Sequence, residues 1–150
     1  MLTLDKIYHA AFVLKEVARR TDLIHAPNLC PDAELYLKTE NLQVTGSFKL
    51  RGAYYKISQL TDEQKRAGII ACSAGNHAQG VALAATRQGA KSVVFMPDSA
   101  PISKVEATKR LGAEVCLVNG AYDDAYEAAV RRQEETGATF IHPFNDDEVI

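Results

Sequence analysis

The second half of the chain alternates short apolar runs with longer stretches whose apolar residues follow a helical spacing. The apolar runs are IIAC from residue 69, SVVFM from residue 92, EVCLV from residue 114 and TFIHP from residue 139. The stretches between them, of which the later two begin near Ser103 and Asp123, close at Gly89, Gly112 and Gly137, and glycine commonly ends helices. Short strands alternating with helices of about ten residues or more predict a β-α-β-α-β-α-β unit with a parallel sheet and right-handed crossovers.

The first third of the chain follows a less regular pattern. Residues 1–20 predict an amphipathic helix, Leu23–Pro31 predicts a loop, and Glu34–Lys38 alternates apolar and polar residues like a strand. Ser47 is a candidate N-cap, and the apolar positions after it predict a further helix.

The predicted sheet also indicates where a ligand should bind. Ligands of open parallel sheets lie at the carboxyl ends of the strands. On this chain those ends fall near Ser73, Pro97, Asn119 and Pro143.

Composition narrows the classes of partner and the compartment. The chain has 150 residues, a net charge of −2 and 47% hydrophobic residues, which fits a soluble protein with a real core and gives no basic surface for nucleic acid. No apolar run reaches the roughly 20 residues of a membrane span. Three widely spaced cysteines without a CxxC pair favour reduced thiols, so we expect a cytoplasmic protein that binds neither nucleic acid nor membranes.

The sequence SAGNHAQG, residues 73–80, follows the first of those strands directly. Small residues at a strand-to-helix junction expose the first backbone N–H groups of the helix, which can bind a carboxylate or a phosphate. A tight turn without a ligand explains the same residues, so this stretch alone leaves both interpretations open.

Lys49 is the second feature with chemical potential. In TGSFKLRGA, residues 45–53, it lies in the predicted first turn of a helix, at the positive end of the helix dipole and close to Arg51. Both neighbours favour the uncharged amine, and neutral lysine amines form Schiff bases, including with pyridoxal phosphate. The alternative is a solvated surface lysine, which the aromatic and small neighbours Phe48, Gly52 and Ala53 make less attractive.

Other chemistries lack their motifs. No GxGxxG opens a helix, Val81 follows Gly80 where a P-loop has lysine, and no GxSxG marks a nucleophilic serine. The four histidines are scattered, without HExxH or paired cysteines, so no metal site is expected.

Taken together, the two stretches resemble a known family. TGSFKLRGAYYKI and ACSAGNHAQGVALAA resemble the threonine dehydratase (threonine ammonia-lyase) family of pyridoxal-phosphate enzymes, which also contains serine racemase. LKTENLQVTGSFKLRGA, LTDEQKRAGIIACSAGNHAQGVA and SAPISKVEATKRLGAEV extend the similarity over nearly the whole chain. In cysteine synthases and cystathionine β-synthases the sequence resembles SxKDR around the lysine and TSGNTG in the loop. Leu50 after Lys49 and His77 after Asn76 differ from these patterns and favour the dehydratase branch.

The resemblance implies a fold and a cofactor site. The fold is α/β, an open parallel sheet flanked by helices, as in fold type II pyridoxal-phosphate enzymes similar to the tryptophan synthase β subunit. Lys49 would be the catalytic Schiff-base lysine, Phe48 would pack behind pyridoxal 5′-phosphate, and Asn76 would hydrogen-bond the ring 3′-oxygen. No metal is implied.

The resemblance also implies a substrate site. The loop that holds the substrate carboxylate would consist of Ser73, Ala74, Gly75, Asn76 and His77. Serine racemases resemble Ser-Ser-Gly-Asn-His here, and the second serine serves the face of the cofactor that the lysine cannot reach. Ala74 takes that position in this chain, which favours a lyase over a racemase.

The expected activity follows from this branch. It is the conversion of L-threonine to 2-oxobutanoate and ammonia, with activity on L-serine, in a homo-oligomeric enzyme of amino-acid metabolism such as isoleucine biosynthesis. Serine racemase and 3-hydroxyaspartate dehydratase are alternatives on the same frame. A non-catalytic amino-acid-binding module is a third, from another class.

One expected part of the family pattern is missing. Relatives hold the cofactor phosphate in a glycine-rich loop, whereas this sequence has no two adjacent glycines. We therefore expect the N-terminal part of a longer, two-domain enzyme, and we expect these 150 residues alone to be inactive. Residues 1–51 would belong to a large cofactor domain, residues 52–145 would form the small αβ domain, and residues 146–150 would return towards the large domain.

Overall fold

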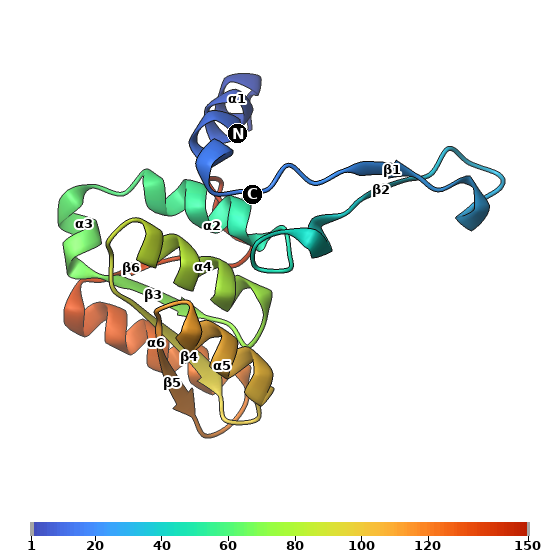
Figure 1. Ribbon diagram of the computed structural model, residues 1–150. Helices are drawn as coiled ribbons and strands as arrows, with labels where there is room; N and C mark the ends of the chain where they lie inside the picture. The colour runs from blue at the N-terminus through green and yellow to red at the C-terminus, as the bar shows by residue number, and fades with distance from the viewer. Residues whose placement is uncertain (1, 150) are drawn as a thin grey trace.

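A four-stranded parallel sheet forms the centre of the protein, in a computed structural model that describes residues 2–149 (Figure 1). The strand order is β5-β4-β3-β6, and all three neighbouring pairs are parallel. The strands are β3 (Ile69–Cys72), β4 (Ser92–Pro97), β5 (Glu114–Val118) and β6 (Thr139–Phe140). The predicted parallel α/β sheet is therefore confirmed, with a last strand that is shorter than the sequence TFIHP indicated.

Helices cover both faces of this sheet. The helices α4 (Asn76–Arg87) and α5 (Ile102–Arg110) lie on one face, and α6 (Tyr122–Thr136) lies on the other (Figure 1). The helix α2 (Lys49–Ser58) packs on the outside of α4. The strands β3, β4 and β5 are each followed by a helix, which places the amino ends of α4 and α5 at the carboxyl edge of the sheet.

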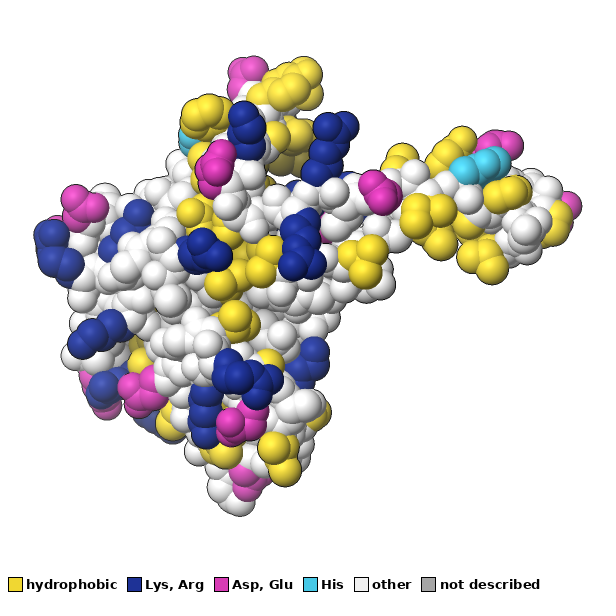
Figure 2. Space-filling view, in the orientation of Figure 1, with side chains coloured by type: hydrophobic (Ala, Val, Ile, Leu, Met, Phe, Trp, Pro, Cys, Tyr) yellow, Lys and Arg dark blue, Asp and Glu magenta, His cyan; other side chains and the backbone are white. Residues whose placement is uncertain are grey.

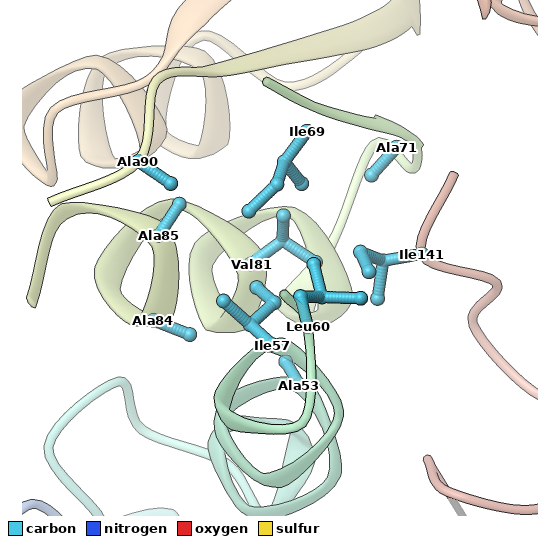
Figure 3. Packing of buried hydrophobic residues seen from close by; sticks show 10 residues of the cluster. All are labelled: Ala53, Ile57, Leu60, Ile69, Ala71, Val81, Ala84, Ala85, Ala90 and Ile141. Carbon is cyan, nitrogen blue, oxygen red and sulfur yellow. The ribbon is translucent and has the colours of Figure 1, made fainter. Parts of the chain in front are cut away.

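The helix α4 is buried on nearly all sides because it lies between α2 and β3. Its residues 77–85 are buried without a gap, and most of them are small. Small side chains let α2 and the sheet approach the helix from opposite sides. Figure 3 shows the resulting cluster, which comprises Ala53, Ile57, Leu60, Ile69, Ala71, Val81, Ala84, Ala85, Ala90 and Ile141.

The end of the described chain returns to α2. A Cβ atom on Gly52 would clash with the backbone carbonyl of Val149, so only glycine fits there. Lys56, one helical turn later, binds Asp146 at 3.1 Å and Glu148 at 2.7 Å. Both contacts hold residues 146–149 against α2.

The N-terminal region extends away from the sheet. It contains the helix α1 (Leu4–Val13), a 3₁₀ turn over Leu14–Glu16, and a projecting arm made of β1 (Leu23–His25) and β2 (Tyr36–Lys38) (Figure 1). The two strands pair antiparallel, from Leu23 opposite Lys38 to His25 opposite Tyr36.

Three sequence-based expectations in the first half of the chain were wrong. The predicted loop Leu23–Pro31 contains β1, whose three residues are all exposed and therefore carry no burial pattern. The helix α3 (Asp62–Ala67) was not predicted, although Thr61 and Gln64 form a capping box at its start. Ser47 is not the N-cap of α2, because the backbone is already helical at Phe48 and the buried Ser47 hydroxyl has no partner within residues 2–149.

Within residues 2–149, none of the helices combines the length and apolar character that a membrane crossing needs. The cysteines Cys30, Cys72 and Cys116 are free thiols.

Candidate functional site

Lys49 opens α2 and lies half-buried against the segment that follows β6. Its Nζ donates a hydrogen bond to the backbone carbonyl of Pro143 at 2.6 Å. The same Nζ lies 5.4 Å from the centre of the Phe48 ring. No carboxylate of residues 2–149 comes within ion-pair distance of it, so the amine is held in place by a neutral acceptor.

The helix α4 approaches the backbone of Lys49 directly. A Cβ atom on Gly80 would lie 3.0 Å from the carbonyl carbon and oxygen of Lys49, so the two helices nearly touch there. Asn76 precedes Gly80 by four residues and therefore lies on the same face of α4, one turn nearer its start. The structure thus brings the first turn of α4 next to the first turn of α2.

The loop before α4 is shaped by one hydroxyl. The Ser73 Oγ accepts the Gly75 N–H at 3.2 Å, which turns the chain from β3 into the helix. Gly75 is the N-cap, and no side chain caps the helix. No atom lies within 4 Å of the position that a Cβ of Gly75 would take, so open space faces the uncapped N–H groups. The uncapped N–H groups at this end of α4 are therefore able to bind an anion.

His77 points away from that space. Its side chain is 3% exposed, and its Nε2 bonds to the Ile141 carbonyl at 2.9 Å. Burial, together with the nearby charges of Lys49 and His142, lowers the pKa of His77 to about 4, although the bond to Ile141 acts in the opposite direction. A neutral imidazole that donates from Nε2 leaves Nδ1 as an acceptor, and this atom has no partner among the described residues. Only the backbone of His77 is therefore available to a substrate carboxylate.

Asn76 is exposed and is held by a residue that the sequence did not single out. Its Oδ1 accepts a hydrogen bond from Lys104 Nζ, in the first turn of α5, at 2.9 Å. Ala74, also in the loop, packs against the apolar cluster between α4 and α5. The only signal for Lys104 in the sequence is its place in the helix after the second strand of the parallel unit.

The charge of Arg51 is paired with Glu40, a partner that the sequence did not indicate. Its guanidinium donates two hydrogen bonds of 2.8 Å to the carboxylate of Glu40. These bonds, with a further one from Thr21, lower the pKa of Glu40 to about 2 against the opposing effect of burial. The pair fixes the start of α2 to the chain that leads from the arm.

A cavity of about 590 Å³ opens beside Lys49. Phe48 and Lys49 form part of its wall, together with apolar residues of α1 and the 143–149 segment, whereas residues 73–77 do not line it. The Phe48 ring is 60% exposed, so one of its faces is free to contact another group.

These residues suit pyridoxal phosphate in three respects. The Lys49 amine is not engaged in an ion pair, the missing side chain of Gly75 leaves room at the start of α4, and the Asn76 Nδ2 has no partner within residues 2–149. The phosphate has no assignable loop on this chain, since no two glycines are adjacent. For a metal, the described residues offer no cluster of three or more histidine, cysteine or acidic side chains.

Comparison with known proteins places these observations in context. Residues 14–150 match the family described as pyridoxal-phosphate dependent enzyme. The chain is 53% identical over 152 residues to an L-threonine ammonia-lyase of Thermotoga maritima. The aligned region covers all of this chain and 38% of that protein. It is 44% identical over 149 residues to a catabolic L-threonine dehydratase of Staphylococcus aureus, covering 97% of this chain and 43% of that protein.

Solved structures agree with the fold. Maize serine racemase superimposes with a TM-score of 0.91 at 35% identity, over 97% of this chain and 45% of that one. The processed form of threonine deaminase isoform 2 from Solanum lycopersicum gives a TM-score of 0.86 at 35% identity, over 99% of this chain and 43% of that one. This chain spans about two fifths of the length of the curated relatives that it matches.

Proposed function

Since the chain belongs to the family of pyridoxal-phosphate dependent enzymes, we propose that the protein is an ammonia-lyase that acts on L-threonine and also on L-serine. The names of relatives at 53% and 44% identity support this substrate class. The observation that carries the proposal is the Lys49 amine, which opens α2 beside the start of α4 and bonds only to the neutral Pro143 carbonyl among the described residues.

The proposal includes the division of the chain. Residues 1–51 would belong to a large cofactor domain, residues 52–145 to a small αβ domain, and residues 146–150 to the return. The projecting arm of β1 and β2 lies apart from the parallel sheet (Figure 1), whereas α2 (Lys49–Ser58) continues across the proposed boundary. A cytoplasmic homo-oligomer that supplies 2-oxobutanoate, for example to isoleucine biosynthesis, completes the proposal.

Lys49 would carry two tasks in the reaction. It would hold pyridoxal phosphate covalently through Nζ, and the same atom, once released, would accept the proton from the α-carbon of the substrate. The cofactor, when bound, supplies an electron sink for that carbon. The Pro143 carbonyl that accepts the hydrogen bond from Nζ carries no charge. The amine can therefore move between these tasks without breaking an ion pair.

The loop Ser73–His77 would hold the substrate carboxylate. The N–H groups at the start of α4 are uncapped, and the space beside Gly75 is open. Ser73 and His77 would act indirectly, because the Ser73 hydroxyl is engaged by the Gly75 N–H and the His77 imidazole is turned inward. Asn76 would donate from Nδ2 to an oxygen of the cofactor ring, and Phe48 would contact the ring through its exposed face.

The net reaction removes the β-hydroxyl and then the amino group. L-Threonine would lose water, and the resulting enamine would take water back as it hydrolyses to 2-oxobutanoate and ammonia. The chain's own contribution is the proton acceptor Lys49 and the anion site of α4, which keep the α-carbon and the amine in one place.

The proposal is tested by incubating the longer enzyme, of which this chain is proposed to be the N-terminal part, with L-threonine, L-serine and 3-hydroxyaspartate and assaying 2-oxo acids. L-Threonine should give 2-oxobutanoate, and Lys49→Ala should abolish it. Lys109→Ala is the matched control, since Lys109 is an exposed lysine of α5 that pairs with Glu106. Retention of turnover in Lys49→Ala would refute the proposed role of Lys49.

Serine racemase is the second candidate, favoured by the superposition on the maize enzyme. Ala74 has no hydroxyl with which to protonate the far face of the substrate, so we expect pyruvate from L-serine without accumulation of D-serine. Chiral chromatography of the same incubation decides between the two. D-Serine formed at a rate comparable with pyruvate would overturn the lyase assignment.

A further inference from the structure

Lys104 and Asn76 join two helices at the carboxyl edge of the sheet. Lys104 lies in the first turn of α5, Asn76 is the first residue of α4, and Nζ and Oδ1 are 2.9 Å apart. The lysine does not serve an ion pair of the described residues, and α4 and α5 are already packed together through Ala78, Ala82 and Val105. The apolar packing alone holds α4 against α5, and the hydrogen bond between Lys104 and Asn76 is not needed for that contact.

The bond determines which way the Asn76 amide faces. An ammonium group has three donors and no acceptor, so only the amide oxygen can face Lys104. The Nδ2 group must then point elsewhere, and its two N–H donors have no partner within residues 2–149. A free asparagine amide could present either end to a ligand, whereas this one is restricted to presenting donors.

The position of Lys104 is also unusual for a helix. Acidic residues occupy the first turns of α1, α3 and α6, as the dipole of a helix favours. The first turns of α2, α4 and α5 contain no acid, and those of α2 and α5 contain Lys49 and Lys104. The starts of α2 and α5 thus each carry a lysine, although its positive charge opposes the dipole of the helix that carries it.

We propose that Lys104 is a positioning residue of the ligand site at the start of α4, which holds the Asn76 amide with its donors towards an anionic ligand oxygen. The inference rests on the proposed function for the identity of that ligand, pyridoxal phosphate. Lys104 itself does not touch the reacting atoms. It acts through Asn76.

The first test follows the amide without any cofactor. In ¹H–¹⁵N spectra of the protein, with Asn76→Ala to assign the side-chain signals, Lys104→Met should shift the Asn76 side-chain amide and speed its exchange with solvent. Lys104→Arg should restore the position of the wild type, and Lys109→Met should leave it unchanged. An Asn76 amide that is identical in Lys104→Met and in the unmutated protein would overturn the proposal.

The second test measures the dissociation constant of pyridoxal phosphate, by its visible absorbance, in the longer enzyme of which this chain is proposed to be the N-terminal part. Lys104→Met should weaken binding about tenfold, the effect of one misplaced hydrogen bond to a charged group, and Lys104→Arg should recover most of it. The double variant Lys104→Met/Asn76→Ala should bind no more weakly than Asn76→Ala alone, because Lys104 acts through Asn76.

The outcomes separate this inference from the proposed function. Additive losses in the double variant, or unchanged binding by Lys104→Met, would overturn the positioning role. Failure of the unmutated protein to bind pyridoxal phosphate would instead overturn the proposed function. The amide spectra would still decide whether Lys104 orients Asn76.

Discussion

At the scale of single residues, two lysines of the same helix show why surroundings decide chemistry. Lys56 contacts two carboxylates, and although burial lowers its pKa, the bonds to Glu148 and Asp146 outweigh it and raise the pKa above the ordinary value. Lys49 contacts one backbone carbonyl. Lys56 therefore holds the end of the described chain against α2, whereas no carboxylate among the described residues prevents Lys49 from reacting.

Gly75 provides a prediction about substrate binding. Its φ of −141° suits any residue, and no atom lies within 4 Å of the position that a Cβ would take. Gly75→Val should therefore fold with nearly unchanged thermal stability, while its side chain fills the space before the α4 N–H groups. We expect the visible absorbance of the bound cofactor to persist and kcat/KM for L-threonine to fall by about a hundredfold or more. An unchanged kcat/KM would mean that this loop is only a tight turn.

His77 provides a prediction about pH. Folded His77 takes up a proton only near pH 4, whereas the unfolded chain takes it up near pH 6.5, so the unfolded state binds more protons between these values. The free energy of unfolding should fall as the pH is lowered through this range, by at most about 3 kcal/mol. Urea unfolding at pH 5 and pH 7 measures the change. In His77→Gln, which can still donate to the Ile141 carbonyl, the fall should be much smaller, and an equal fall in both proteins would contradict the assignment.

At the scale of elements, the contact of α2 with α4 connects the fold to the site. Gly80 allows the α4 backbone to approach the Lys49 backbone, and Asn76 lies one helical turn before Gly80. Small residues along α4 then allow the sheet to pack on its other side (Figure 3). The packing at Gly80 thus sets the position of Lys49 relative to the start of α4.

Gly80→Ala tests this connection. The added methyl group would lie 3.0 Å from the Lys49 backbone, which cannot yield without moving α2. The helix gains propensity from alanine, but overpacking costs about 1–3 kcal/mol, so the net change should be destabilising. Thermal unfolding should show a lower Tm, and cofactor affinity should fall as Lys49 shifts. Gly75→Ala, whose methyl group enters open space, is the matched control and should change neither the Tm nor the cofactor affinity. A Gly80→Ala protein with the stability and cofactor affinity of the wild type would refute the connection.

Most of the elements that the sequence predicted correctly pack into the core, although β2 was predicted and all three of its residues are exposed. The strands from residues 69 and 92 are buried or half-buried, and three residues of the strand from residue 114 are half-buried, so their apolar residues indicate the sheet. The strand β1 is exposed and pairs with β2 through backbone bonds, and its His25 stacks on Tyr36 and contacts Glu34. Such contacts give no burial pattern that the sequence could show. The helix α3 is short and has no buried residue, although its capping box could have revealed it.

The candidate site divides in the same way. Lys49 and the Ser73–His77 loop were found because a cation or a row of small residues is conspicuous at a helix start. The inward turn of His77, the engagement of Arg51 by Glu40 and the bond from Lys104 to Asn76 join residues that are 11 to 64 positions apart. Local sequence patterns do not report such contacts.

At the scale of the whole molecule, apolar side chains are exposed on the N-terminal region. Figure 2 shows them along the projecting arm and over α1. The arm exposes Leu23 by 63% and Leu29 by 69%, and α1 exposes Phe12 by 78%. Proteins that act as monomers rarely expose so much apolar surface in one region. Further protein, from a longer chain or a second copy, should cover it.

A hydrophobic dye tests this expectation. The 150-residue chain should bind the dye and self-associate in light scattering, and Leu23→Ser/Leu29→Ser should reduce both without lowering the Tm of the αβ unit, because neither side chain is buried. A monomeric chain that does not bind the dye would show that this surface needs no cover.

The account depends most on the identity of one amine, and peptide mapping after borohydride reduction tests it most directly. Borohydride fixes pyridoxal phosphate to the lysine that holds it, and mass spectrometry of the digested protein identifies that lysine. The account predicts the label on Lys49, in the peptide that contains Phe48 and Leu50, and no label in Lys49→Ala. A label on Lys56, Lys104 or any other lysine would contradict it.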